Sequence, residues 1–188
     1  GLLPIGLAPD PEGYRFLDRN TGVEYRLGAD SVPQRLGALS LAPGEELDAA
    51  RWQDGAWIVG LRDLRAKRFL LRRLDTGGAV TLFQSASADS VQRIPRYHLA
   101  GSAAGLLLTR LTAPFDLLLV DPARGTVDTI ARPLADATLY GAVIDSSLHW
   151  RALPGVALDC GWLLTLTDLQ SDRRLLLRYD AGRRLAKV

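Results

Sequence analysis

Short runs of apolar residues recur along the whole chain, and each is followed within a few positions by an aspartate and then a glycine. The aspartate–glycine pairs are Asp18 and Gly22, Asp75 and Gly77, Asp121 and Gly125, and Asp180 and Gly182. An Asp side chain bonds to the backbone two residues on, and Gly supplies the positive φ that a reversing chain needs. The pattern therefore predicts four antiparallel hairpins. Helical periodicity is weak, with one short candidate over 45–52. The first strand of the second unit is expected at 36–42 or at 47–52, within that same segment.

A stricter correspondence links two distant parts of the chain. The segment 57–64 (WIVGLRDL) matches 162–169 (WLLTLTDL) at a constant offset of 105 positions. The same offset relates Leu70 to Leu175, and a shorter copy runs over 105–112. Self-similarity of this kind indicates one supersecondary unit that is repeated. We expect a single β repeat domain over 1–188, with units of about 1–30, 36–85, 93–133 and 138–188.

Four antiparallel strands per unit, repeated along a chain, are typical of β-propeller blades. An apolar strand, an Asp turn, a Gly and a further strand, as in 117–127 (LLLVDPARGTV), resemble the outer hairpin of generic bacterial propellers of the NHL-like and quinoprotein-like kind. The resemblance implies an all-β, propeller-like fold of about three and a half blades, because 1–27 supply only two or three strands. A closed propeller needs at least four blades. We therefore expect an incomplete or open array, or a partner that covers its edge.

Composition excludes several classes of protein. The 188 residues are 47% hydrophobic and 23% charged with a net charge of +2, so the chain is too apolar and too balanced to be disordered. The sequence has no uncharged run of the length that a transmembrane helix needs. The single Cys excludes a disulfide framework. The absence of Met indicates either a removed leader or anchor, which would place the protein outside the cytoplasm, or an excised domain.

The basic residues do not predict a nucleic-acid surface. The densest cluster comprises Arg62, Arg65, Lys67, Arg68, Arg72 and Arg73, and Asp63 and Asp75 interrupt or flank it. Nucleic-acid surfaces usually carry a stripe of one sign. We interpret the cluster as the solvated face of a hairpin, and we expect neither a nucleic-acid nor a membrane partner.

Motifs that carry chemistry are sparse. The chain has no P-loop, dinucleotide fingerprint or G-x-S-x-G motif. The lone Cys160 is interpreted as a small buried hydrophobe. We expect no catalytic residue, no metal site and no cofactor. His98 and His149, about one unit apart in predicted innermost strands, remain candidates for binding at a central channel.

The four tryptophans divide into two pairs. Trp57 and Trp162 occupy equivalent repeat positions and are expected in the core. Trp52 and Trp150 lie upstream, beside an arginine each, and such pairs are enriched at contact hot spots. The candidate binding residues are therefore Arg51, Trp52, His98, His149, Trp150 and Arg151.

These observations favour a non-catalytic binding or assembly module that presents a propeller-like surface to a protein partner or to a second copy. One alternative is a hydrolase or metal-dependent enzyme with its site at the channel mouth. Another is a β-rich segment of an extracytoplasmic appendage or envelope protein whose N-terminal anchor has been removed. A binding module should expose an aromatic or apolar patch, whereas an enzyme should gather titratable groups in a pocket.

Overall fold

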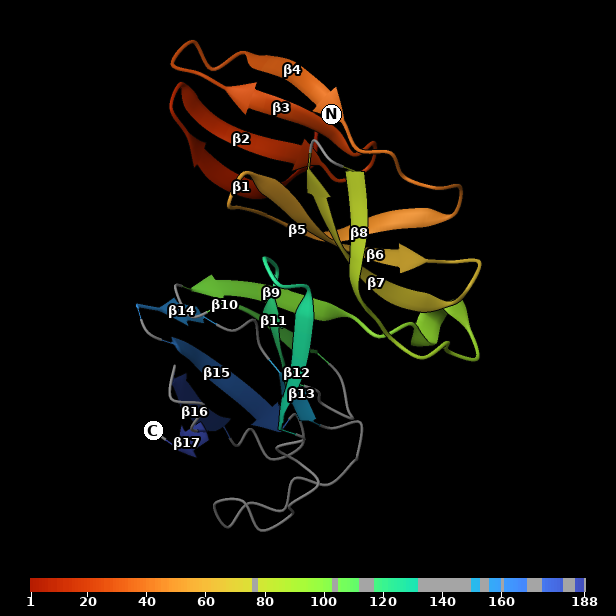
Figure 1. The fold of residues 1–188 in the computed structure, drawn as a ribbon, viewed down its shortest axis with the longest axis vertical. Helices are drawn as coiled ribbons and strands as arrows, with labels where there is room; N and C mark the ends of the chain where they lie inside the picture. The colour runs from red at the N-terminus through yellow and green to blue at the C-terminus, as the bar shows by residue number, and fades with distance from the viewer. Residues whose placement is uncertain are drawn as a thin grey trace. The chain divides into compact units, whose positions relative to one another are not determined.

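The computed structural model comprises two compact units, Gly1–Ile94 and Pro95–Val188 (Figure 1). It describes residues 1–75, 78–102, 105–111, 117–131, 150–152, 156–159, 161–168, 174–180 and 185–187. The described residues form four antiparallel sheets that follow one another in chain order. The predicted all-β fold of antiparallel, blade-like units is confirmed, and the sheets number four where three and a half were expected.

The first sheet is a complete meander. Its strands are β1 (Pro4–Asp10), β2 (Gly13–Asp18), β3 (Val23–Leu27) and β4 (Pro33–Ala38), and they neighbour one another in that order. The predicted second unit began at residue 36, which lies inside β4. Because β4 pairs with β3 from Leu27↔Pro33 to Val23↔Ala38, it completes the first sheet instead. This misplaced strand accounts for the fractional count.

The second sheet follows the same order. Its strands are β5 (Glu45–Gln53), β6 (Ala56–Asp63), β7 (Arg68–Asp75) and β8 (Gly78–Gln84). The helical candidate over 45–52 is wrong, because these residues form β5. The reason lies in the next two residues, Asp54 and Gly55, whose φ angles of 50° and 76° make the two-residue turn into β6. An Asp-Gly dipeptide is a strong hairpin signal.

The second unit contains the other two sheets. The third comprises β9 (Tyr97–Ser102), β10 (Gly105–Arg110), β11 (Leu117–Asp121) and β12 (Thr126–Ala131). The fourth comprises β13 (Trp150–Ala152), β14 (Val156–Leu158), β15 (Gly161–Asp168), β16 (Arg174–Asp180) and β17 (Leu185–Lys187). Both β13 and β14 pair with β15, one at each of its ends. Together these two short strands take the place of the single first strand in the other sheets. A single turn of 3-10 helix, η1 (Val91–Arg93), closes the first unit.

Two aspartate turns share a geometry but not a place in their sheets. The Gly22 N–H donates to the Asp18 carbonyl at 2.8 Å, and the Gly125 N–H donates to the Asp121 carbonyl at 2.9 Å. Both glycines have positive φ, 67° and 66°. However, Asp18 ends the second strand of its sheet and Asp121 ends the third. The predicted alignment of the repeats is therefore wrong by one strand at Asp18. The turn motif specifies the local backbone geometry but not which strands of a sheet it connects.

The outer strands of three sheets carry a β-bulge at the same place. The unpaired extra residue is Leu36 in β4, Leu82 in β8 and Ile130 in β12. A bulge interrupts the ladder and bends the strand. Since bulges are one means of blunting a free sheet edge, their recurrence indicates that each outer strand ends its sheet.

In the first unit, the core lies between the two sheets. Leu17 of β2 packs with a buried set from the second sheet: Leu47, Trp57, Val59, Leu61 and Leu70. The first strands of the two sheets also meet closely. Gly6 in β1 has a φ of +70°, and a Cβ at this position would lie 2.8 Å from the Ala50 Cβ of β5. Glycine is therefore required where β1 crosses β5.

The core of the second unit repeats the same positions. Trp162, Leu164, Leu166 and Leu175 are buried, as are Trp57, Val59, Leu61 and Leu70 at the offset of 105. The Trp162 ring stacks on Tyr179 of the neighbouring strand, with 5.7 Å between centroids. The expectation that Trp57 and Trp162 are core residues is confirmed, with exposed fractions of 2% and 0%.

Candidate functional site

One cross-strand row of the second sheet forms the floor of the candidate site. Trp52 of β5 pairs with Trp57 of β6, which pairs with Leu74 of β7, which pairs with Ala79 of β8. Residues directly opposite one another in antiparallel strands share a face. Burial falls along the row, from Trp57 in the core through the half-buried Leu74 to the exposed Ala79. The row thus runs from the core to the outer edge of the sheet.

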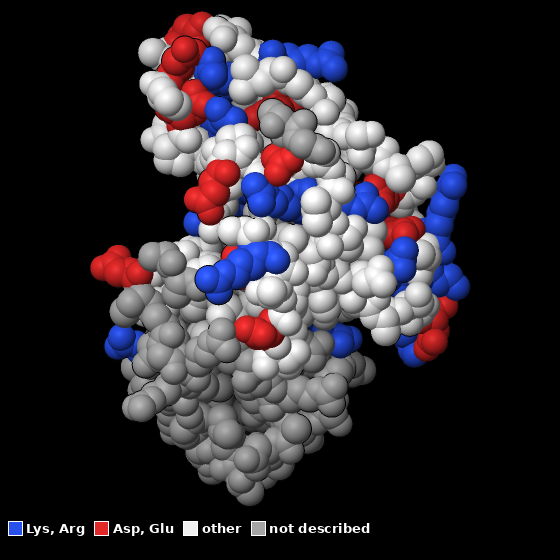
Figure 2. Space-filling model, viewed as in Figure 1, with Lys and Arg blue, Asp and Glu red and all other residues white. Residues whose placement is uncertain are grey.

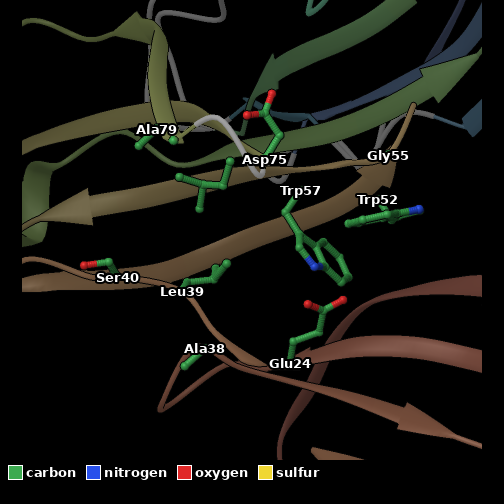
Figure 3. A pocket seen from close by; sticks show the side chains of 11 residues that line it. Glu24, Ala38, Leu39, Ser40, Trp52, Gly55, Trp57, Asp75 and Ala79 are labelled. Atoms are coloured by element: carbon green, nitrogen blue, oxygen red, sulfur yellow. The ribbon is translucent and has the colours of Figure 1, made fainter. Parts of the chain in front are cut away.

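A cleft of about 390 Å³ opens above this row (Figure 3). Its opposite wall comes from the first sheet and the segment after β4, through Glu24, Leu39 and Ser40. Trp52 and Trp57 meet edge to face, with 5.3 Å between ring centroids and 69° between planes. The two indoles give the cleft a rigid aromatic corner, because each ring restricts the rotation of the other.

Arg15 of β2 holds Trp52 in place from the other side. Its guanidinium carbon lies 4.0 Å from the Trp52 ring centroid, a cation–π contact. Its nitrogens bond to the Asp10 carboxylate and reach Glu24 Oε1 at 3.3 Å. Arg15 therefore links the first sheet to the indole that lines the cleft.

The Asp10 carboxyl is the buried anchor of this arrangement, with a side chain 1% exposed. The hydrogen bond from Arg15 lowers the pKa of Asp10 below its ordinary value, and burial opposes that shift. Arg26 adds a second cation, its Nε lying 3.0 Å from Asp10 Oδ1. The carboxylate therefore remains charged at neutral pH and keeps Arg15 over the indole.

Trp57 brings an unused hydrogen-bond donor to the cleft. Its indole nitrogen is buried and has no acceptor among the described residues. At the equivalent position of the second unit, Trp162 Nε1 donates to the Ala100 carbonyl at 2.7 Å. Buried indole N–H groups usually find a partner, so the Trp57 donor departs from the pattern that its own repeat sets.

The two carboxylates that border the cleft are both engaged by arginines. Glu24 is directed toward the Trp57 ring (Figure 3) and pairs with Arg15. Asp75 points away from the indoles (Figure 3), and its Oδ2 lies 3.2 Å from Arg73 Nη2. The cleft therefore combines apolar walls with charges that are already balanced.

A second hollow of about 300 Å³ in the first unit has a different character. It is lined mainly by polar residues of the β2–β3 turn, β5 and β6. Two ion pairs lie within the hollow, Arg19 with Asp48 at 3.1 Å and Arg62 with Glu46 at 3.2 Å, and Glu45 pairs with Arg72 outside it. No aromatic side chain lines it, and it therefore ranks below the tryptophan cleft as a ligand site.

The basic cluster of 62–73 is neutralised pair by pair. Four of its arginines have a carboxylate within 4 Å: Arg62 with Glu46, Arg68 with Asp63, Arg72 with Glu45 and Arg73 with Asp75. Lysines and arginines alternate with acidic residues over the face shown in Figure 2. The balance of charge matches the interpretation, but the cluster does not occupy one face of the hairpin, because Arg68 and Arg72 lie on one side of β7 and Arg73 on the other.

The structure separates two residues that the sequence had paired. Trp52 lines the cleft, whereas the adjacent Arg51 pairs with Ile58 in β6. Successive residues of a strand point to opposite faces, so Arg51 lies on the face away from the cleft. The adjacent pair therefore supplies one residue to this site, and the cation over Trp52 comes from Arg15.

The other candidates lie in the second unit. His98 of β9 faces Thr109 of β10, and burial lowers the pKa of this imidazole. The backbone of Trp150 and Arg151 forms β13, opposite Asp168 and Thr167 of β15. Their side chains lie outside the described set, as do His149 and Cys160, so the predictions for these residues stay predictions.

Sequence reasoning missed Arg15, Glu24, Leu39 and Leu74, which build the cleft with the two tryptophans. Leu74 was recoverable, because antiparallel pairing of β6 with β7 across the 64–67 connection places it opposite Trp57. Arg15, Glu24 and Leu39 belong to the first sheet and its exit, and only packing between two sheets brings them to the cleft. No local spacing signals that packing.

The described residues contain neither a cluster of metal-binding side chains nor a membrane-spanning helix. No three His, Cys, Asp or Glu side chains within the described ranges lie close enough together to hold a metal ion. No helix in that part of the chain has the length and hydrophobicity to cross a membrane.

Comparison with known proteins adds no family. The chain matches no protein-family model, and no curated protein is significantly similar to it. The architecture of the described residues is an all-β fold of four antiparallel sheets.

Proposed function

We propose that this chain is a non-catalytic binding module, and that the cleft of its first unit receives a segment of a protein partner. The observation that carries the proposal is the row Trp52, Trp57, Leu74 and Ala79, which leaves the core and runs along the floor of a 390 Å³ cleft. Large apolar side chains fixed in a concave site are the usual anchors of a contact surface.

The dimensions of the cleft favour a peptide segment over a folded surface. Ligand pockets measure roughly 300–1,000 Å³, so this cleft takes a few side chains of an extended segment. The indole corner offers apolar area with little conformational freedom to lose, since Arg15 and Trp57 already restrain Trp52. Restraint before binding lowers its entropic cost.

The electrostatics of the cleft support binding over catalysis. A general acid or base needs a carboxyl that is free to exchange a proton with the substrate. Glu24 and Asp75 instead face Arg15 and Arg73. Charges balanced in this way hold the walls of the cleft in place, and that suits a surface that recognises its ligand by shape.

We also propose that the four sheets are blades of a propeller-like array of the NHL-like or quinoprotein-like kind. In the first unit, neighbouring sheets meet through their first strands, β1 and β5, at Gly6 and Ala50. In the second unit, Trp162 of one sheet bonds to Ala100 in the first strand of the other. Adjacent blades of a propeller pack around their inner strands in this manner.

Selection from a random twelve-residue peptide library displayed on phage, with the full-length chain immobilised, tests the binding proposal. Selected peptides are synthesised with a fluorescent label, and their affinity is measured by anisotropy. Ala79→Phe fills the exposed end of the cleft without touching the core, so we expect it to weaken binding by at least about tenfold, or 1.4 kcal/mol. Trp52→Ala should weaken binding similarly.

The matched control is Val32→Phe, which adds the same ring to a residue of the first unit that is 59% exposed and does not line the cleft. This variant should bind like the unmodified chain. Failure to select any peptide, or selected peptides that bind Ala79→Phe as well as the unmodified chain, would overturn the proposal.

A further inference from the structure

Besides the cleft, four features of the described residues stand out: the polar hollow, the His98–Thr109 pair, the exposed apolar residues near the N-terminus, and the outer strand β8. The first three each lack an observation that names a ligand. Strand β8 differs, because its sequence, its pairing and its position beside the cleft bear on one another.

The free edge of β8 has no charged residue and no proline. Its sequence is GAVTLFQ. Each of the other three outer strands contains at least one: Pro33 and Arg35 in β4, Asp128 in β12 and Lys187 in β17. Charges and prolines are the usual means by which proteins prevent a free edge from pairing with another chain. Among the described strands, β8 therefore has the outer edge that is best suited to accept one more strand.

The pairing of β8 defines how much edge is available. Within the described strands, β8 pairs with β7 alone. Its bulge lies at Leu82, since Thr81 pairs with Arg72 and Phe83 pairs with Leu71. The regular part of the edge is thus 78–81, and all four of these residues are exposed. Alternate residues of an edge strand direct their N–H and C=O groups outward, ready for a further ladder.

This edge continues into the cleft. Gly78 and Ala79 line the cleft, and Ala79 ends the row that contains both tryptophans. A strand added to β8 would place one residue directly opposite Ala79, and its side chain would fall on the same face as that row. Ala79 is small, so that side chain would lie over it and reach the cleft. The main chain and one side chain of a ligand can therefore be bound together.

We propose that an extended segment of a partner polypeptide adds to β8 as a fifth strand and inserts an apolar side chain into the cleft. The inference rests on the proposed function and specifies how that site is occupied. In strand addition, main-chain bonds supply affinity and pockets for alternate side chains supply specificity. A second copy of this chain fits less well, because the bulge leaves four residues for self-pairing, far too few for a standard interface of about 1,600 Å².

The test uses the peptides selected from the random library and two matched variants of the full chain. Thr81 and Thr129 are both exposed, and each precedes the bulge residue of its outer strand. Thr81→Lys adds a charge to the edge of β8, and we expect peptide affinity to fall by about tenfold or more. Thr129→Lys adds the same charge to β12 and should leave the affinity unchanged.

Backbone methylation of the peptide supplies a second readout. An added strand directs every second N–H toward β8, so two peptides are made, with methyl groups on the odd or on the even nitrogens. We expect one set to abolish binding and the other to be tolerated. We also expect hydrogen exchange over 78–81 to slow when the unmodified peptide binds.

The outcomes separate the two proposals. If Ala79→Phe weakens binding but Thr81→Lys and both methylated peptides behave alike, the cleft is a binding site and strand addition is overturned. If the selected peptides bind the Ala79→Phe variant as tightly as the unmodified chain, the proposed function and this inference are both overturned. A dimer in light scattering that Thr81→Lys converts to a monomer would assign the edge to a second copy and overturn the partner segment.

Discussion

Trp57 and Trp162 occupy the same repeat position, 105 residues apart, but their indole nitrogens have different surroundings. Trp162 Nε1 donates to the Ala100 carbonyl at 2.7 Å. Trp57 Nε1 has no acceptor among the described residues. Both rings are buried, so burial does not distinguish the two positions, whereas the hydrogen bond does. The cleft lies beside the tryptophan that lacks one.

Replacing each of these tryptophans with Phe should therefore cost different amounts of stability. Both variants lose the same apolar area, but only Trp162→Phe also breaks a hydrogen bond, worth about 1 kcal/mol net. We expect the local unfolding free energy of β15 in Trp162→Phe to fall by about that much more than that of β6 in Trp57→Phe. Hydrogen exchange measures the two separately, since two compact units need not unfold together. Equal losses would contradict the assigned bonds.

Gly6 is expected to be intolerant of any side chain. Its φ is +70°, and an added Cβ would lie 2.9 Å from the Ala50 carbonyl carbon and oxygen. The left-handed backbone costs an L-residue about 1–2 kcal/mol, and overpacking commonly adds about 1–3 kcal/mol. We expect Gly6→Ala to lower the free energy of unfolding of the first unit by at least about 2 kcal/mol.

Gly37 provides the control for Gly6→Ala in the same sheet. Nothing lies within 4 Å of a Cβ added there, and its φ is not in the left-handed region. Gly37→Ala should change stability by no more than about 0.5 kcal/mol. Urea denaturation of both variants makes the comparison, and similar losses would argue against the close approach of β1 to β5.

Arg15→Met should alter the response of the first unit to acid. Arg15 is the main cause of the lowered pKa of Asp10. A depressed carboxyl pKa stabilises the folded state fully above the unfolded value of about 3.9, and that stability is lost as pH falls through the folded value. Without Arg15 the pKa of Asp10 rises toward the unfolded value, so the carboxyl contributes less stability and less is lost in acid. Carbon-detected NMR titration of Asp10 measures the shift.

The exposed Arg35 of β4 supplies the control for this charge change. Arg35→Met removes one cation from the same sheet but none from the surroundings of Asp10. It should leave the titration of that carboxyl unchanged. If Arg15→Met also leaves the titration unchanged, Arg15 does not bind Asp10 as described.

The inner hairpins of the last three sheets were predictable because their signals are local. Short continuous apolar runs bounded by Asp and Gly mark β6, β7, β10, β11, β15 and β16 within about two residues. The repeat at an offset of 105 placed Trp57 and Trp162 in their cores correctly. Apolar runs bounded by turn residues suffice for such elements.

The first sheet and the cleft were not predictable in this way. Asp18 forms the same turn as Asp121 but one strand earlier in its sheet. A turn motif does not encode which strands it joins, so β4 was assigned to the next unit. The contact of Arg15 with Trp52 depends on the packing of one sheet against another, which neither residue's neighbours in sequence reveal.

His98 should make the second unit less stable in mild acid. Burial lowers the pKa of this imidazole below its ordinary 6.5. The folded state therefore favours the neutral form. The stability that the neutral imidazole contributes to the folded state is fully present above the unfolded pKa of about 6.5. It declines as pH falls from there toward the lower pKa of the folded state. Hydrogen exchange of β9 and β10 at pH 7.5 and pH 5.5 should show the decline in the unmodified chain.

Two variants assign that decline to the imidazole. His98→Phe keeps a ring at the position but cannot take up a proton, so the difference between the two pH values should disappear. Thr109 lies directly opposite His98, and neither its hydroxyl nor His98 Nδ1 has a partner among the described residues. Thr109→Val removes a neutral group and should retain the pH dependence, because burial and not the hydroxyl lowers the pKa. A decline that persists in His98→Phe would have to come from another titrating group.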